Sequence, residues 1–285
     1  MSWKRIVLGS VLLLCSLDLF SCRSPAPLQQ PAVPGNQRLI SLAPNLTEIL
    51  FALGVGDRVL AVTGPDDYPP EVKELPRVGG LQLDYERLIA LKPDQVLADS
   101  ELNGHQLEKL RELRLPVQAF QATDLPGLLE TIVGLGAAVG AQEQALALRQ
   151  RLERGLSEME RQVEALPRRP TVFVEIWAQP LMTAGSGSYV GDLVERSGGI
   201  NVFADLEGYP RVTDEQMLVL DPEVIVLTVS TPEEAAGRPG WHRLKAVKEG
   251  AVHRIDSDLL ARPSPRVLEA LGVMHGWFRA RVEKP

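Results

Sequence analysis

The chain has 285 residues, a formal net charge of −7 and 45% hydrophobic residues. This length is enough for two ordinary domains, each with its own hydrophobic core. The negative charge argues against nucleic acid or an anionic membrane surface as the partner, because neither attracts an acidic protein.

The first 21 residues have the features of a secretory signal peptide. Lys4 and Arg5 precede an apolar stretch, residues 6–17, and Leu-Phe-Ser-Cys follows at residues 19–22. The stretch is far below the ~20 residues that a membrane-spanning helix needs. The ending resembles a bacterial lipobox, in which the cysteine is acylated after cleavage. We expect Cys22 to carry a lipid anchor, and an ordinary signal peptide with an incidental cysteine is the alternative.

Residues 22–37 are expected to be a tether, since residues 23–37 hold four prolines and three glutamines without apolar periodicity. Cys15 lies inside the signal peptide, so the mature chain has no cysteine pair for a disulfide although it works in an oxidising compartment. The sequence predicts an extracytoplasmic monomer, periplasmic or at the cell surface, that the lipid anchor alone holds to the membrane.

From residue 38 onward, short apolar runs alternate with helical patterns. This alternation predicts an α/β fold with mostly parallel sheets. In the first helix, Asn45 or Thr47 is expected to be the N-cap and Gly54 the stop. The predicted elements of the first half are strand 38–42, a helix to 53, strand 59–62, helix 85–91, strand 95–98, helix 104–113 and strand 117–120.

An internal repeat indicates that the chain contains two similar α/β units. Residues 86–97 align without a gap on residues 215–226, and each copy reads as a short helix, a turn with proline followed by an acid, and a strand. Between the copies, residues 142–166 contain no proline and carry apolar residues three or four apart, which predicts one long helix. We expect an N-terminal lobe at 38–140, a rigid linking helix at 141–168 and a C-terminal lobe at 169–285.

Six segments carry a family resemblance that covers nearly all of residues 38–282. They are Arg-Leu-Ile-Ser-Leu-Ala-Pro-Asn-Leu-Thr-Glu at 38–48, Asp-Tyr-Pro-Pro at 67–70, and the segments 86–94, 177–185, 197–202 and 264–266. They resemble the helical-backbone class of periplasmic binding proteins, which serve ABC importers of cobalamin, iron-siderophores and haem. The resemblance implies two lobes with the ligand cleft between them, an ABC permease dimer as partner, no enzymatic activity and no cofactor. Through residues 67–70 and 258–266 the resemblance is closest to the cobalamin-binding members, which implies cobalamin as the transported ligand, with a siderophore or haem as alternatives.

A corrinoid offers a flat apolar face, so its site needs aromatic walls and a few polar groups. Tyr68, Trp177 and Tyr209 stand at predicted strand ends or in loops, where a cleft would be lined. The resemblance places the ligand at Tyr68, Tyr209 and Asp258 and near Trp177, and an aromatic that merely packs is the alternative for each ring. Leu81 completes the expected site, although the family's cobalamin proteins carry a tryptophan near this position.

The four histidines are scattered, and none pairs at helical spacing, so the sequence argues against a bare-metal receptor. His105 follows a first-lobe strand and could ligate a haem iron or a cobalt, although a solvated loop histidine is the alternative. A hydrolase is a remote alternative, because Gly185-Ser186-Gly187 lacks the spacing of a nucleophile elbow and Glu175 has no evident partner.

The two copies of the repeat each place an acid in the first turn of the short helix. Glu86 and Glu215 occupy the same position, with Asp84 and Thr213 as expected N-caps. An acid there also complements the helix dipole. The family resemblance implies contacts to a matching pair of arginines on the permease, so we expect Glu86 and Glu215 to dock on the transporter.

Overall fold

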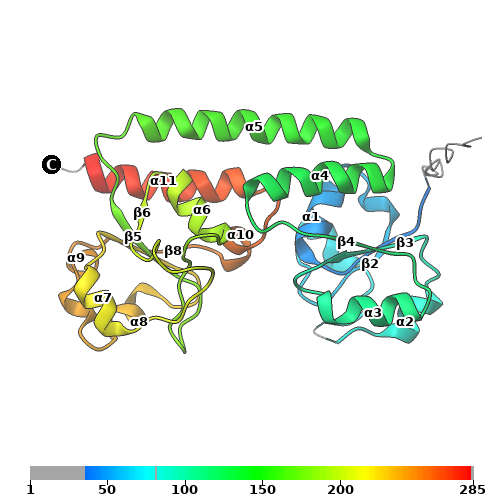
Figure 1. The fold of residues 1–285 in the computed structure, drawn as a ribbon, viewed down its shortest axis with the longest axis horizontal. Helices are drawn as coiled ribbons and strands as arrows, with labels where there is room; N and C mark the ends of the chain where they lie inside the picture. Colours follow the sequence, from blue (N-terminus) through cyan, green and yellow to red (C-terminus); the bar gives the residue numbers. More distant parts are fainter. Residues whose placement is uncertain (1–35, 81, 284–285) are drawn as a thin grey trace, which may run out of the picture. The chain divides into compact units, whose positions relative to one another are not determined.

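The computed structural model describes residues 36–80 and 82–283 (Figure 1). Its first sheet has four parallel strands. Their order across the sheet is β2-β1-β3-β4, so the chain starts in the middle and builds outward on both sides. The strands are β1 (Leu39–Ser41), β2 (Val59–Ala61), β3 (Gln95–Asp99) and β4 (Val117–Phe120).

The second sheet repeats this arrangement. Its four strands are also parallel, in the order β6-β5-β7-β8. They are β5 (Thr171–Glu175), β6 (Ile200–Asn201), β7 (Val224–Leu227) and β8 (Val252–Arg254). The predicted α/β fold with mostly parallel sheets is confirmed.

Helices cover both faces of each sheet, as parallel strands require because neither face of such a sheet can remain in water. In the first half these are α1 (Pro44–Ala52), η1 (Gly56–Arg58), η2 (Pro70–Glu74), α2 (Tyr85–Ala90), α3 (Gly104–Glu112) and α4 (Leu125–Val139). The second half has α6 (Tyr189–Arg196), α7 (Asp214–Leu220), α8 (Pro232–Ala236), η3 (Trp241–Arg243), α9 (Lys245–Lys248), α10 (Ser257–Ala261) and α11 (Val267–Glu283). Among the described residues, none of these helices combines the length and apolar character needed to cross a bilayer.

The long helix predicted at residues 142–166 is α5 (Gln142–Glu164), which packs on α4 and on α6 and α11 (Figure 1). Its buried side chains Ala145, Leu148, Leu152 and Met159 recur every three to seven residues along one stripe, while the rest of its surface is charged. The helix therefore contacts elements of both lobes through one apolar face.

Alternation along the strands sends side chains into separate cores. In β1, Leu39 enters the core that α5 helps to form, while Ile40 enters a core on the opposite face. In β5, Val172 and Phe173 divide in the same way. The core that contains Leu152 of α5 runs without a break from one sheet to the other, and such continuous packing resists hinge motion between them.

The repeat is visible in the turns that precede β3 and β7. Lys92 and Asp221, which occupy the same repeat position, both adopt the left-handed conformation, with φ of 46° and 40°. Two residues later Asp94 accepts a hydrogen bond from the backbone N–H of Arg38 at 2.7 Å, and Glu223 accepts one from that of Thr171 at 3.2 Å. The acid after each proline therefore ties its turn to the start of the lobe's first strand.

One predicted helix cap was wrong. The N-cap of α1 is Ala43, followed by Pro44, which fits the first helical position because its missing N–H would have no partner there. Asn45 instead donates to Asp99, and the Thr47 hydroxyl donates back to the carbonyl of Ala43 at 3.2 Å. The other expected caps are confirmed, since Asp84 and Thr213 accept from the backbone N–H groups of α2 and α7.

Candidate functional site

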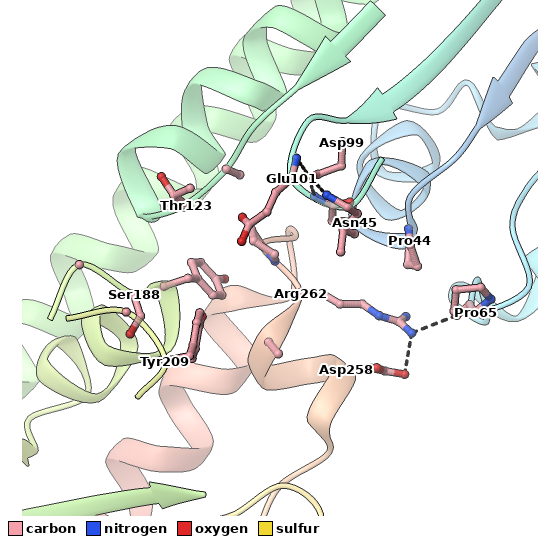
Figure 2. A pocket seen from close by; sticks show the side chains of 17 residues that line it. Pro44, Asn45, Pro65, Asp99, Glu101, Thr123, Ser188, Tyr209, Asp258 and Arg262 are labelled. Atoms are coloured by element: carbon pink, nitrogen blue, oxygen red, sulfur yellow. Dashed lines mark hydrogen bonds and ion pairs between the residues drawn. The ribbon is translucent and has the colours of Figure 1, made fainter. Parts of the chain in front are cut away.

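A cavity of about 560 Å³ lies where residues of the two sheets' loops meet (Figure 2). Its size falls within the range of about 300–1,000 Å³ that is usual for small-molecule sites. The lining residues from the first lobe are Pro44, Asn45, Pro65, Asp99, Glu101, Leu102, Ala122 and Thr123. Those from the second lobe are Gly187, Ser188, Tyr189, Gly208, Tyr209, Asp258, Ala261, Arg262 and Pro263.

The topology explains why these residues meet. In the first lobe they all end or follow a strand: Asn45 comes after β1, Pro65 after β2, Glu101 after β3 and Thr123 after β4. The carboxyl ends of parallel strands lie along the same edge of the sheet, which is where α/β proteins bind ligands. The four segments that follow β1, β2, β3 and β4 therefore form one wall of the cavity.

The first wall is organised around the carboxylate of Asp99. Asp99 is buried, and it accepts hydrogen bonds from Asn45 Nδ2 at 3.0 Å, Glu101 N at 2.9 Å and Leu102 N at 3.1 Å. These bonds fix the amide of Asn45 against the carboxylate, as Figure 2 shows. Glu101 itself is exposed at the cavity.

The second wall carries two tyrosines and the start of α6. Ser188 is the N-cap of α6 and accepts from Gly191 N at 3.1 Å. Tyr189 is only 3% exposed, whereas Tyr209 is 40% exposed. Burial, and to a smaller extent the neighbouring Tyr209 hydroxyl, raises the pKa of Tyr189, so this phenol stays neutral and keeps its proton.

Arg262 of the second lobe crosses to the first lobe at the edge of the cavity (Figure 2). Its guanidinium donates to Asp67 Oδ1 at 2.6 Å and to the Pro65 carbonyl at 3.1 Å, and it pairs with Asp258 Oδ2 at 2.6 Å. Burial raises the pKa of Asp258, and the charge of Arg262 opposes that shift. Asp258 thus lines the cavity, and one of its carboxylate oxygens pairs with Arg262.

Behind Arg262, a second arginine joins the lobes through a buried carboxylate. Glu48 has a side chain only 2% exposed, and it accepts from Arg266 Nε at 2.9 Å and Nη2 at 2.7 Å. Arg262 Nη1 lies 3.4 Å from the same carboxylate. A paired arrangement of this kind is needed because an isolated buried charge would be very costly.

Tyr68 belongs to a smaller neighbouring cavity of about 360 Å³, and it is not among the residues that line the larger one. The guanidinium of Arg266 lies 4.1 Å from the centre of its ring, within the range of a cation–π contact. Tyr68 is 42% exposed, so one side of the ring remains accessible.

The structure brings together Tyr209 and Asp258 of the predicted ligand site. Trp177 is 54% exposed, donates its Nε1–H to the carbonyl of Gln179 at 3.0 Å, and is not among the residues lining either cavity. His105 is exposed on α3 and does not line the larger cavity. Leu81 and Cys22 lie outside the described residues.

The two predicted docking acids are exposed in the first turns of α2 and α7. Hydrogen bonds from its own backbone N–H and from Thr213 lower the pKa of Glu215, so it is charged at neutral pH. Apolar side chains flank both acids, with Ile89 46% exposed and Val219 83% exposed. Helices α2 and α7 both pack on the sheet face opposite to the one that contacts α5.

Glu175 and Ser186, the polar residues that a hydrolase would use, both have hydrogen-bond partners within the fold. Glu175 is fully buried at the end of β5, where it pairs with Arg238 and accepts from Ser230 N at 2.8 Å. Ser186 donates to the carbonyl of Leu206 at 3.0 Å. Within residues 36–80 and 82–283, no cluster of histidine, cysteine, aspartate and glutamate could hold a metal ion.

Sequence reasoning missed most of the polar lining, namely Asn45, Asp99, Glu101, Ser188 and Arg262. The signal that could have found Asn45 and Asp99 is their position, since Asp99 ends β3 and Asn45 lies in the first turn of the helix that follows β1. Arg262 gave no comparable signal, because its partners Asp67 and Pro65 are almost two hundred residues away in sequence.

Residues 39–259 match the profile of a family described as periplasmic binding protein. The chain is 34% identical to the vitamin B12-binding protein of Vibrio cholerae over 82% of its own length and 86% of that protein. It is 28% identical to an uncharacterised ABC transporter substrate-binding lipoprotein of Bacillus subtilis, over 94% of this chain and 95% of the relative.

The similar solved structures are also periplasmic binding proteins. The crystal structure of the periplasmic vitamin B12-binding protein of Vibrio cholerae has a TM-score of 0.76 at 30% identity and covers 87% of this chain and 98% of its own. A periplasmic heme-binding protein from Pseudomonas aeruginosa has a TM-score of 0.78 at 25% identity, over 87% of this chain and 94% of its own. These relatives are named as binding proteins, not as enzymes, in agreement with the expectation from the sequence.

Proposed function

The chain belongs to the periplasmic binding protein family, and from this premise we propose that it captures cobalamin between its two lobes and delivers it to the permease of an ABC importer. The observation that carries the choice of ligand is the similarity to the Vibrio cholerae vitamin B12-binding protein, in sequence and in fold. The chain itself needs no cofactor, since cobalamin would be its cargo. A siderophore or haem is the alternative cargo within the same family, as the similarity to a heme-binding protein illustrates.

The charge of the cavity supports cobalamin over the alternatives. Asp99, Glu101 and Asp258 line it, and Arg262 faces them already engaged with Asp67 and Asp258. A haem with two carboxylates or an anionic ferric siderophore would meet this excess of negative charge at short range. Cobalamin carries neutral amides around its corrin ring, so that rim avoids the repulsion.

Tyr209 and Asp258 are the proposed contacts that lie at the cavity itself. Tyr68 and Trp177 are each about half exposed and lie outside this lining, and we keep them, with Leu81, as proposed contacts for the parts of the ligand that extend beyond the cavity. A corrinoid is larger than a drug-sized molecule, so some of it must project from a cavity of about 560 Å³. His105 as an axial ligand stays a proposal for the haem alternative alone.

A binding panel tests the choice of ligand. Cyanocobalamin, haemin and a ferric catecholate siderophore are added in turn to the mature domain, and thermal unfolding is followed by circular dichroism. A ligand at about 100 times its Kd stabilises the folded state by about 2.7 kcal/mol. We expect this effect with cyanocobalamin alone, and stabilisation by haemin or by the siderophore without an effect of cyanocobalamin would reject cobalamin as the cargo.

We further propose that Glu86 and Glu215 dock on the two permease subunits, with Ile89 and Val219 completing each contact. Their exposure, their charge and the matching positions of α2 and α7 support this role. Exposed charges act on association more than on folding. The double variant Glu86→Lys/Glu215→Lys should bind cobalamin normally and fail in uptake. Glu143→Lys on α5 is the control and should keep normal uptake. Normal uptake by the double variant would refute the docking role.

The remaining assignments concern the termini and boundaries. We propose a signal peptide at 1–21, a tether at 22–37 that is lipidated on Cys22, lobes at 38–140 and 169–285, and the linking helix at 141–168. The Bacillus subtilis relative is called a lipoprotein, which supports the anchor. The monomeric state stays a prediction.

A further inference from the structure

Two buried polar atoms of the cavity wall have no hydrogen-bond partner among the described residues. They are Oδ1 of Asn45, in the first lobe, and the hydroxyl of Tyr189, in the second. Six side-chain atoms of the described residues are orphaned in this way, and these two alone belong to residues lining the cavity. Each residue is 3% exposed. An unpaired buried polar group costs stability, so its presence on both sides of one cavity calls for an explanation.

The hydrogen-bonding character of the two atoms is fixed by their surroundings. Asn45 donates Nδ2 to a carboxylate oxygen of Asp99 at 3.0 Å. The flipped amide would place its oxygen against that carboxylate, so the free atom of Asn45 is an acceptor. Tyr189 is a neutral phenol, which offers a donor.

We propose that Asn45 Oδ1 and the Tyr189 hydroxyl are specificity-determining contacts that recognise carboxamide groups on the rim of the ligand. A primary amide supplies the N–H that Asn45 accepts and the carbonyl to which Tyr189 donates. This inference rests on the proposed function, and it names the part of a corrinoid that the site recognises.

The same pair discriminates against carboxylates. An ionised carboxylate has no proton to give to Asn45 Oδ1, and Asp99 lies directly behind that amide. A ligand that presents a carboxylate at this point therefore leaves Asn45 unpaired and meets repulsion from Asp99. Sites built to satisfy a polar group reject analogues that lack it much more strongly than apolar sites reject a missing methyl group.

Neither atom has surface open to solvent, so a ligand reaches them only if neighbouring wall groups shift. Tyr209 is the neighbour that would move, because it is 40% exposed and follows Gly208, which has a φ of 67°, and its displacement breaks the hydrogen bond between its side chain and the backbone of Val190. Binding would then combine a small displacement of the Tyr209 loop with pairing of the two buried atoms.

Removal of the Tyr189 hydroxyl should stabilise the protein without ligand and weaken the binding of the ligand. Tyr189→Phe removes an unpaired hydroxyl and keeps the ring, so the variant without ligand should melt higher, by about 2–4 °C, and bind cyanocobalamin about three- to tenfold more weakly. Tyr85→Phe, half-buried on α2 and away from the cavity lining, is the matched control and should change neither value.

Asn45 is tested by selectivity, since Asn45→Ala also removes the bond to Asp99. The probes are cyanocobalamin and its monocarboxylic acids, in which one rim amide is hydrolysed. The wild-type chain should prefer the amide form by about tenfold or more over at least one monocarboxylic acid, and Asn45→Ala should narrow that ratio. An unchanged ratio would overturn the role of Asn45.

The outcomes separate this inference from the proposed function. If the wild-type chain does not bind cyanocobalamin, the proposed function fails, and the carboxamide assignment fails with it. Two results would overturn the inference alone, given that the wild-type chain binds cyanocobalamin. Equal affinity of Tyr189→Phe would mean that the hydroxyl does not contact the ligand. A lower melting temperature of Tyr189→Phe without ligand would mean that the hydroxyl already has a partner in the protein.

Discussion

The buried carboxylate of Glu48 offers the sharpest test of how the two lobes are held together. Glu48→Gln keeps the shape of the side chain but removes the charge that faces Arg266 at 2.7 and 2.9 Å. Arg262 keeps Asp67 and Asp258 as partners, whereas Arg266 keeps mainly the face of the Tyr68 ring. Breaking one side of a buried pair typically costs about 3–5 kcal/mol. Since glutamine still accepts one hydrogen bond, we expect a loss near the lower end, about 3 kcal/mol.

Urea unfolding, followed by circular dichroism, measures this loss. The control is Glu153→Gln on α5, whose pair with Arg149 leaves both side chains about 40% exposed and should be worth about 0.3–0.5 kcal/mol. The double variant Glu48→Gln/Arg266→Gln removes both charges, so it should be destabilised by less than the sum of the two single variants. A Glu48→Gln protein within about 0.5 kcal/mol of the wild type would refute this account of the interlobe contact.

Three further outcomes are expected. Tyr209→Ala and Trp177→Ala should each weaken cobalamin binding by about 1–3 kcal/mol in a calorimetric titration, and unchanged affinity would remove that ring from the site. Cys22→Ser should move the protein from the membrane to the soluble fraction, and continued sedimentation with membranes would contradict the anchor. Arg168 chiefly lowers the pKa of Glu223 to about 2, so this carboxylate stabilises the fold above about pH 4.5 and loses that contribution as the pH falls toward 2. Glu223→Gln should lower the free energy of unfolding by about 1–2 kcal/mol at pH 7, because Arg168 is half exposed and solvent screens the pair. The variant should also lose less stability than the wild type between pH 4.5 and pH 2, and an equal loss in the two proteins would refute the contribution of Glu223.

The sequence predicted the periodic elements of the fold well. Helix α5 was expected at residues 142–166 and lies at Gln142–Glu164, because its apolar stripe is long and uninterrupted. The repeat also holds in three dimensions, with β3 and β7 in equivalent places in their sheets. Helix α4 was not predicted, although Asp124 followed by Leu-Pro-Gly is a helix start with a capping acid and an early proline.

The candidate site was predicted less completely, for a physical reason. Tyr209 stands out in the sequence as an aromatic in a loop, and the family resemblance places both Tyr209 and Asp258 at the ligand; both residues line the cavity. The bond from Asn45 to Asp99 spans 54 residues, and that from Arg266 to Glu48 spans 218. No local pattern marks such pairs, because they exist only once the strands have brought their carboxyl ends together.

A titration of the mature chain with cyanocobalamin, run beside Ala261→Trp, tests the central claim most directly. Ala261 is exposed at the end of α10 and lines the cavity, so a tryptophan there should obstruct the cavity without disturbing a core. We expect the wild-type chain to bind one cobalamin with a Kd of about 1 μM or lower, which is a free energy of about −8 kcal/mol, and Ala261→Trp to bind at least about tenfold more weakly. No binding heat with the wild type, or equal affinity in the two proteins, would contradict the capture of cobalamin between the lobes.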